Sequence, residues 1–347
     1  MKGNNKNPSR VFPIFPVSLN MILFDNHNRP ISYVRLAVTD RCNLRCFYCM
    51  PEEGIKYLPK KEVMTFEEIE RLITLLARLG IKKVRLTGGE PFVRNDLMRL
   101  IERITSIEGI EEVHITTNGI LTSPHIPDLM RLGVRSVNLS LDTLNAERFR
   151  NITRRDEFDA TRKTLDSLLA HGIPVKINTV VMDGKNIEDI LPLVELTRHQ
   201  DIGVRFIEEM PFNGTGEKTG VRWDHKKIIH HISQEFAGLK KLPDPPFSTS
   251  SNYQIEGHKG TVGVIAAFSR TFCGTCNRIR VTAQGELKTC LYGDGVLNLK
   301  SLMRDGKSDM EIRDHLLHAF SHRAKDGFEA ERRKAQPIHE SMSTIGG

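Results

Sequence analysis

Apolar residues in the first two thirds of the chain form short runs that alternate with segments of helical spacing. Residues 33–38 are a mostly apolar run, which predicts a strand. Residues 66–79 predict a helix, because apolar side chains recur every three to four positions after Thr65, an N-cap with Glu68 three residues on. The same patterns predict further strands at 83–87, 112–117, 136–141, 174–181 and 203–207, and helices at 96–104, 126–132, 159–171 and 187–197.

Six predicted strands that alternate with helices indicate parallel βα units, which the right-handed crossover rule winds into a barrel or an open sheet. We therefore predict an α/β fold, an incomplete (β/α)6 TIM-type barrel. Active sites of such barrels lie at the carboxyl ends of the strands. Five of the six predicted strands end in or carry polar or glycine-rich residues there, namely Gly88-Gly89-Glu90-Pro91, Thr116-Thr117-Asn118-Gly119, Ser140-Leu141-Asp142, Lys176 with Asn178, and Glu208-Glu209-Met210-Pro211.

Each of these motifs has a plainer interpretation when it is taken alone. The Gly88–Pro91 segment could be only a tight turn, and its functional alternative is a backbone edge that pairs with the amino and carboxylate groups of a ligand. Met210 could be core filling.

The pattern changes after residue 211, where 213–220 is glycine-rich and polar. A helix is predicted at 223–236, and short strands at 261–266, 278–281 and 286–288. We predict a small C-terminal α+β domain after the barrel. The predicted division is a disordered extension at 1–20, the barrel at 21–212, the second domain at 213–300, and a C-terminal helix and tail at 301–347.

Composition excludes several classes of protein. No segment has the roughly 18 consecutive apolar residues of a membrane span. The net charge is +7, but the basic residues are interleaved with 43 acids, so we expect no nucleic-acid partner. The excess positive charge indicates either a solvated surface or a few arginines focused on an anionic substrate such as a nucleoside triphosphate. Six cysteines in 347 residues are too few for a disulfide scaffold, so we expect a reducing compartment, the cytoplasm.

Three cysteines, Cys42, Cys46 and Cys49, follow the first predicted strand in a CxxxCxxC spacing. Three thiolates from one short loop can hold three irons of a [4Fe–4S] cube and leave the fourth iron open. A zinc loop or a chance trio of buried thiols are the alternatives.

The other three cysteines, Cys273, Cys276 and Cys290, form a second incomplete set. A histidine such as His258 could complete it as a zinc site, or it could hold a second [4Fe–4S] cluster with its own open iron. Arg278 and Arg280 alternate on a predicted strand and so share a face, where two guanidiniums would suit phosphates or a purine edge.

The segment CxxxCxFYC resembles the signature of the radical S-adenosylmethionine (SAM) enzymes, whose open iron chelates SAM. Three further segments make the chain resemble, over residues 21–347, the GTP 3′,8-cyclase family, which starts molybdenum cofactor biosynthesis. These segments are Cys273-Gly-Thr-Cys276-Asn-Arg278-Ile-Arg280, Cys290-Leu-Tyr-Gly and Ser343-Thr-Ile-Gly346-Gly347. The resemblance also makes Met21 a hypothetical start. Taken alone, Gly346 and Gly347 would be a frayed terminus.

The resemblance implies a role for each matching residue. Cys42, Cys46 and Cys49 would hold the SAM cluster, and Cys273, Cys276 and Cys290 the auxiliary one. The SAM contacts would be Tyr48, Gly89, Ser140 and Met210. The GTP contacts would be Arg35, Arg85, Thr116, Lys176, Arg278 and Arg280. The diglycine tail, Gly346 and Gly347, would reach into the active pocket.

The reaction implied by the resemblance begins with reductive SAM cleavage to a 5′-deoxyadenosyl radical. That radical would take hydrogen from C3′ of GTP, and C3′ would then join C8. Uptake of one electron and one proton by the resulting aminyl-type radical would give (8S)-3′,8-cyclo-7,8-dihydroguanosine 5′-triphosphate. The implied partners are a flavodoxin- or ferredoxin-type electron donor and a downstream cyclic pyranopterin monophosphate synthase, and a homodimer is allowed. The alternatives are another radical SAM enzyme with an auxiliary cluster, or a non-catalytic iron–sulfur or zinc protein.

Overall fold

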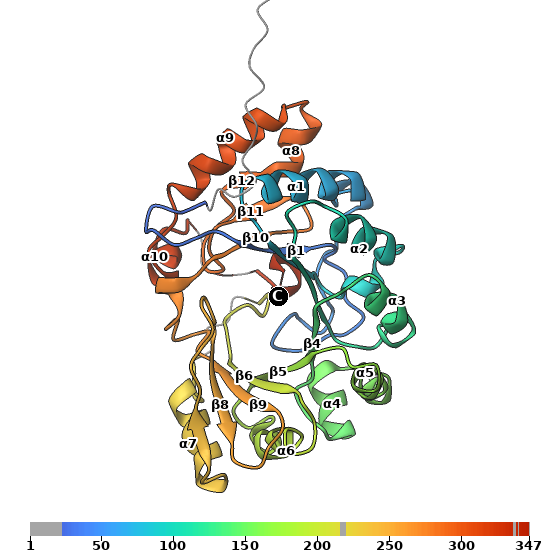
Figure 1. The fold of residues 1–347 in the computed structure, drawn as a ribbon, viewed down its shortest axis with the longest axis vertical. Helices are drawn as coiled ribbons and strands as arrows, with labels where there is room; N and C mark the ends of the chain where they lie inside the picture. The colour runs from blue at the N-terminus through green and yellow to red at the C-terminus, as the bar shows by residue number, and fades with distance from the viewer. Residues whose placement is uncertain (1–22, 216–219, 336–337, 339, 347) are drawn as a thin grey trace, which may run out of the picture.

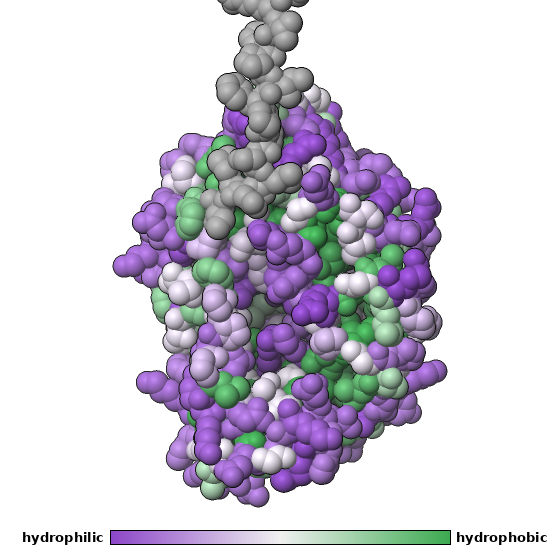
Figure 2. Space-filling view, viewed as in Figure 1, coloured by the Kyte–Doolittle hydropathy of each residue, from purple (hydrophilic) through white to green (hydrophobic). Residues whose placement is uncertain are grey.

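The computed structural model describes residues 23–215, 220–335, 338 and 340–346. The extension predicted at 1–20 and the terminal Gly347 lie outside these residues. One curved sheet forms the centre of the fold, and the helices cover its outer face (Figure 1). Hydrophilic side chains dominate the face of the molecule seen in Figure 2. Within the described part of the chain, no helix is both long enough and apolar enough to cross a membrane.

Twelve strands of the described residues form the sheet, in the order β12-β11-β10-β1-β2-β3-β4-β5-β6-β9-β8-β7. The strands are β1 Tyr33–Ala37, β2 Lys83–Thr87, β3 Glu112–Thr117, β4 Ser136–Ser140, β5 Val175–Val181, β6 Gly203–Glu208, β7 Leu239–Lys241, β8 Ser250–Ile255, β9 Thr261–Ile265, β10 Arg278–Val281, β11 Glu286–Lys288 and β12 Leu297–Asn298.

The helices lie mainly between consecutive barrel strands and at the C-terminal end of the chain (Figure 1). They are α1 Phe66–Arg78, α2 Leu97–Thr105, α3 Ile126–Arg131, α4 Ala146–Thr153, α5 Phe158–Ala170, α6 Ile190–Glu195, α7 His225–Glu235, α8 Leu299–Arg304, α9 Asp309–Phe320, α10 Gly327–Arg332 and α11 Met342–Ile345.

Strands β1 to β6 are parallel and pair in chain order, as predicted for an incomplete (β/α)6 barrel. The capping box expected at the start of α1 is present, because the Thr65 side chain accepts from the Glu68 N–H and the Glu68 side chain accepts from the Thr65 N–H. Helix α4 was not predicted. It contributes only Phe149, Ile152 and Thr153 to the interior, too few for a clear apolar period.

Strands from the C-terminal segment continue the barrel sheet at both of its edges. Strand β10 pairs in parallel with β1, and β9 pairs in parallel with β6. The hairpin strands β8 and β7 then extend one edge, while β11 and β12 extend the other. The segment predicted as a second domain therefore brings its cysteines to the same sheet as the first triad.

The two faces of the barrel sheet differ in chemistry. Side chains such as Val34, Leu36 and Val84 are fully buried in the apolar core. Alternate positions, among them Arg35 and Arg85, line the barrel interior instead. Because neighbouring side chains of a strand point to opposite faces, this alternation gives an apolar layer under the helices and a polar, cationic interior.

Candidate functional site

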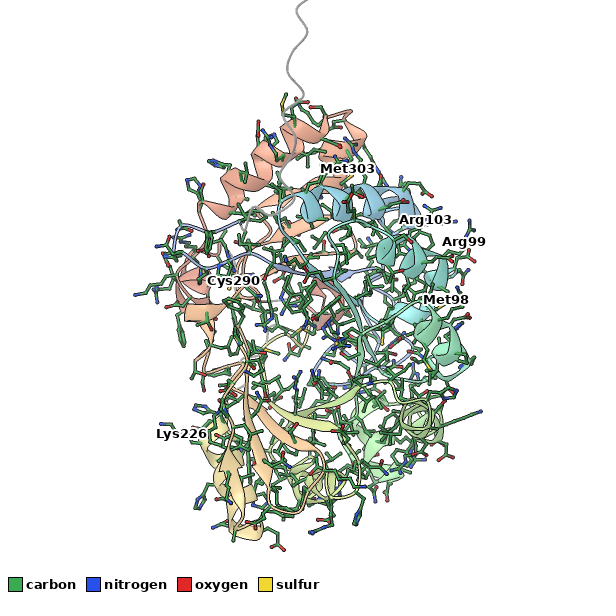
Figure 3. All side chains as sticks on the ribbon, viewed as in Figure 1. Met98, Arg99, Arg103, Lys226, Cys290 and Met303 are labelled. Carbon is green, nitrogen blue, oxygen red and sulfur yellow. The ribbon has the colours of Figure 1, made fainter. Side chains whose placement is uncertain are left out.

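All six cysteines line one cavity of about 520 Å³ inside the barrel. None of the six forms a disulfide. Figure 3 labels Cys290, which lies beside α10, where it packs against a small apolar cluster around Tyr292 and Ala330. The two cysteine triads therefore border the same cavity, as a site shared by two clusters requires.

The first triad is held by the loop that follows β1. The Leu44 N–H donates to Cys42 Sγ at 3.4 Å, and the Cys49 N–H donates to the Cys46 carbonyl at 2.9 Å. Burial, followed by nearby Glu90, raises the pKa of the Cys42 thiol to about 12, and burial raises that of Cys49 to about 11. Buried thiols with such pKa values become thiolates readily only when a metal replaces the proton, so the donor set fits a cluster.

The second triad is fastened by side chains that sequence reasoning missed. Arg323 donates to the carbonyl oxygens of Cys276 at 3.4 Å, Arg278 at 3.0 Å and Thr289 at 3.1 Å. Arg29 donates to the Cys273 carbonyl at 3.1 Å. The buried carboxylate of Asp25 pairs with both guanidiniums, at 2.7 Å from Arg29 and 3.1 Å from Arg323.

His258 does not complete the second triad. Its Nδ1 lies 2.8 Å from Thr197 Oγ1, and its ring packs edge-on against Phe236. The zinc alternative that used His258 is therefore wrong. Around the triad itself, burial opposes ionisation of Cys276, but the guanidiniums of Arg278 and Arg323 lower the pKa of that thiol.

The four residues expected to contact SAM, Tyr48, Gly89, Ser140 and Met210, all line the cavity. The Tyr48 hydroxyl donates to Asp142 Oδ2 at 2.7 Å, which fixes the ring beside Cys49. The partners of Met210 include the apolar cluster around Phe212, so this residue both packs and faces the cavity.

The backbone of the Gly88–Glu90 segment packs against the cysteine loop. The Gly89 N–H donates to the Thr39 carbonyl and the Glu90 N–H to the Arg41 carbonyl, at 2.9 and 2.8 Å. A Cβ on Gly89 would lie 2.2 Å from the Arg41 oxygen, so glycine is required there. The chain itself accepts the hydrogen bonds of these two N–H groups, and the pairing of this segment with the amino and carboxylate groups of a ligand stays a prediction.

A row of arginines crosses the barrel interior. Arg280 on β10 is paired in register with Arg35 on β1, which is paired with Arg85 on β2. Burial and mutual repulsion lower the pKa of Arg280 to about 10 and lower that of Arg35 well below its usual value.

The other predicted GTP contacts, Thr116, Lys176 and Arg278, line the same cavity. Burial and neighbouring Arg205 lower the pKa of Lys176 to about 8. Lys83 and Arg205 also line the cavity, and sequence reasoning missed them because single cations on strands form no motif.

Lys83 pairs with Glu112 at 2.7 Å, but six other cations of the cavity lack an opposite charge within the described chain. Among the described residues, no carboxylate forms an ion pair with any of Arg35, Arg85, Lys176, Arg205, Arg278 and Arg280. Because burying unpaired charge is costly, such a cluster is suited to a polyanionic ligand.

The C-terminal segment enters the cavity from the side of β1 and β10. The Gly346 carbonyl accepts from Arg280 Nη1 at 2.7 Å and from Arg35 Nε at 3.3 Å. Gly346 has φ +78°, and a Cβ there would lie 3.0 Å from Thr87 Oγ1. The frayed-terminus interpretation is therefore wrong for Gly346.

Two family models match the chain. Residues 36–197 match the radical SAM superfamily, and residues 202–328 match the family described as Molybdenum Cofactor Synthesis C. The chain is 38% identical over 333 residues to GTP 3′,8-cyclase of Desulforamulus reducens, with 94% of this chain and 100% of the relative covered.

It is also 44% identical over 295 residues to molybdenum cofactor biosynthesis protein 1 of Dictyostelium discoideum, with 84% of this chain and 47% of the relative covered. The chain thus spans about half the length of the first curated relatives it matches. Among solved structures, Streptococcus suis SuiB bound to S-adenosylmethionine has a TM-score of 0.57 at 16% identity, covering 83% of this chain and 69% of that one. This likeness supports the fold.

Proposed function

The chain belongs to the radical SAM superfamily and, within it, to the GTP 3′,8-cyclase family, and from this premise we propose that it converts GTP to 3′,8-cyclo-7,8-dihydro-GTP. This reaction would be the first step of molybdenum cofactor biosynthesis. The family uses SAM and two [4Fe–4S] clusters. The observation that carries the proposal is the single cavity lined by both cysteine triads and by an unpaired row of cations.

Each triad would hold one cluster. Cys42, Cys46 and Cys49 would hold the cluster that binds SAM, and Cys273, Cys276 and Cys290 the auxiliary cluster. When bound, the clusters and SAM supply the electron transfer and the hydrogen-abstracting radical, which no side chain of the cavity can provide.

The side chains of the cavity would bind and orient the two small molecules. Arg35, Arg85 and Lys176 would neutralise the triphosphate, which carries about four negative charges, and the lowered pKa values of Arg35 and Lys176 would rise when the anion binds. Arg278 and Arg280, on one face of β10, would hold the guanine side near the second triad. Tyr48, Gly89, Ser140 and Met210 would surround SAM. Holding C3′ of GTP close to SAM is the main contribution of the protein.

The proposed partners follow from the same chemistry. A flavodoxin- or ferredoxin-type protein would supply the electron, and a cyclic pyranopterin monophosphate synthase would consume the product. The six free thiols support a reducing compartment, which we propose to be the cytoplasm. A homodimer is compatible with these roles.

An anaerobic nucleotide panel tests the function. The reconstituted protein is incubated with SAM, dithionite and one nucleoside triphosphate at a time, and 5′-deoxyadenosine and the cyclised nucleotide are measured. We expect GTP alone to give both products. Equal deoxyadenosine formation with all four nucleotides, or cyclised product from none of them, would contradict the proposal.

A further inference from the structure

Three buried oxygen acceptors on consecutive barrel strands face the cavity without a hydrogen-bond partner among the described residues. They are Thr116 Oγ1 on β3, Asn138 Oδ1 on β4 and Asn178 Oδ1 on β5. Asn138 is the most enclosed, with 5% of its surface exposed. A buried amide oxygen without a partner is destabilising, so its presence in a cavity indicates that a ligand supplies the missing donor.

The strand register separates these acceptors into two levels. Asn138 is paired with Thr116 on one side and with Lys176 on the other, and both neighbours are proposed GTP contacts. Asn178 lies two residues farther along β5 and is paired with Ser140, a proposed SAM contact. Two residues along a strand correspond to about 6.6 Å, so Asn138 lies at the level of GTP, below that of SAM.

The chemistry of the amide selects the part of GTP that it contacts. A phosphate oxygen is an acceptor and would leave Asn138 Oδ1 unpaired, whereas a hydroxyl both donates to Oδ1 and accepts from Nδ2. The guanine edge would be held beside the second triad on β10. Strands β1, β2 and β3 separate β10 from β4, which places β4 about 19 Å away along the sheet. The ribose, which joins the base to the phosphates, is the part of GTP that remains for Asn138.

We propose that Asn138 binds the ribose hydroxyls of GTP and thereby selects a ribonucleotide over a deoxyribonucleotide. This inference rests on the proposed function and adds a specificity-determining residue to it. Its neutral side chain suits the uncharged sugar, while the flanking Lys176 is available for the triphosphate.

Binding measurements on the reconstituted protein test the proposal. The dissociation constants of GTP, 2′-deoxyGTP and 3′-deoxyGTP are determined anaerobically by equilibrium dialysis, without reductant. We expect the wild-type protein to favour GTP over at least one deoxynucleotide, and Asn138→Ala to reduce that preference about tenfold, the value of one neutral hydrogen bond. The preference of Asn138→Ser, whose shorter side chain still carries a hydroxyl, should lie between those of the wild-type protein and Asn138→Ala.

Asn252→Ala is the matched control, because it removes an amide from β8 whose Nδ2 donates to Asp244 Oδ1 at 2.9 Å outside the cavity. This control should keep the wild-type preference. Thermal unfolding and iron content identify any variant that fails to fold, and Asn138→Ser then carries the test.

Three outcomes would overturn the inference. The first is a wild-type protein that binds GTP and both deoxynucleotides equally. The second is a folded Asn138 variant whose preference for GTP over the deoxynucleotides is unchanged. The third is a variant that keeps this preference but binds SAM more weakly, which would assign Asn138 Oδ1 to the SAM ribose. Failure of the proposed function is distinguishable, because it would appear in the wild-type protein as the absence of cyclised nucleotide when GTP, SAM and reductant are all present.

Discussion

At the scale of single residues, the cavity combines motif residues with lone cations that have no motif. The cysteines, Arg278 and Arg280 could be predicted because their spacing has a chemical meaning by itself. Lys83 and Arg205 could not, since one cation on a strand is compatible with either face of a sheet. Asn138 was missed for the same reason, because an asparagine becomes informative only when its oxygen is known to lack a partner.

Substitution of Arg280 should impair cyclisation while SAM cleavage continues. Arg280→Ala removes a charged donor that would hold the nucleotide, so we expect GTP affinity to fall by about 10- to 100-fold. Slow SAM cleavage under dithionite should continue, since the first triad is untouched. Arg313→Ala, which removes an exposed arginine of α9, is the control. Unchanged yield of cyclised product in Arg280→Ala would refute this role.

Asp25 should make the stability of the structure that holds the second triad depend on pH. Burial would raise the pKa of Asp25, but the Arg29 and His27 N–H groups and the guanidiniums of Arg29 and Arg323 hold it below its ordinary value of 3.8. The carboxylate therefore stabilises the fold above about pH 4, and this contribution is lost as pH falls through the lower pKa of the folded state.

We expect Asp25→Asn to lose about 3–5 kcal/mol of unfolding free energy at pH 7, because two buried guanidiniums lose their carboxylate, and to lose less at pH 3, which lies below the ordinary pKa of 3.8. Urea unfolding at the two pH values measures this difference. Asp305→Asn, which changes an exposed acid at the end of α8, should have little effect at either pH. An equal loss at both pH values would show that the carboxylate acts through packing alone.

At the scale of elements, the C-terminal segment is fixed before it reaches the cavity by ion pairs between buried lysine side chains and partly exposed acids. Lys288 on β11 is fully buried and lies 2.5 Å from Glu340, while Lys334 lies 3.2 Å from Glu340 and 2.9 Å from Asp294. The Ser341 hydroxyl donates to the Cys49 carbonyl at 2.6 Å. Except for the pair of Lys334 with Glu340, these contacts join residues far apart in the sequence, so composition alone could not predict them.

Deleting Gly346 and Gly347 should therefore act on catalysis rather than on folding. The ion pairs of Glu340 remain in the truncated chain, so the melting temperature and the iron content should stay at wild-type values. Turnover should fall by at least about tenfold, because Arg35 and Arg280 lose a carbonyl that orients them. Wild-type turnover in the truncated protein would mean that the tail contributes nothing to the reaction.

Whether a strand could be predicted depends on how clearly its sequence alternates between apolar and polar residues. Strands β2, β3, β10 and β11 were predicted with their observed bounds, because apolar or alternating runs end at polar turns. Strand β8 was missed, since four of its six residues are only partly buried and its sequence is polar. The pairing of β10 with β1 was also missed, because register between distant segments leaves no local signal.

At the scale of the whole molecule, one continuous sheet brings two distant cysteine sets to a single chamber. The parallel pairs β1 with β10 and β6 with β9 place the C-terminal segment at both edges of the barrel. The sequence allowed the barrel and both triads to be predicted, whereas their arrangement around one cavity required the fold.

The most direct test of this shared chamber is the fate of one hydrogen atom. The reconstituted protein is incubated anaerobically with dithionite, SAM and GTP that carries deuterium at C3′, and the 5′-deoxyadenosine is analysed by mass spectrometry. If SAM at the first triad and GTP at the second meet in one cavity, the deoxyadenosine gains one deuterium. Deoxyadenosine without deuterium, formed together with cyclised nucleotide, would contradict the account.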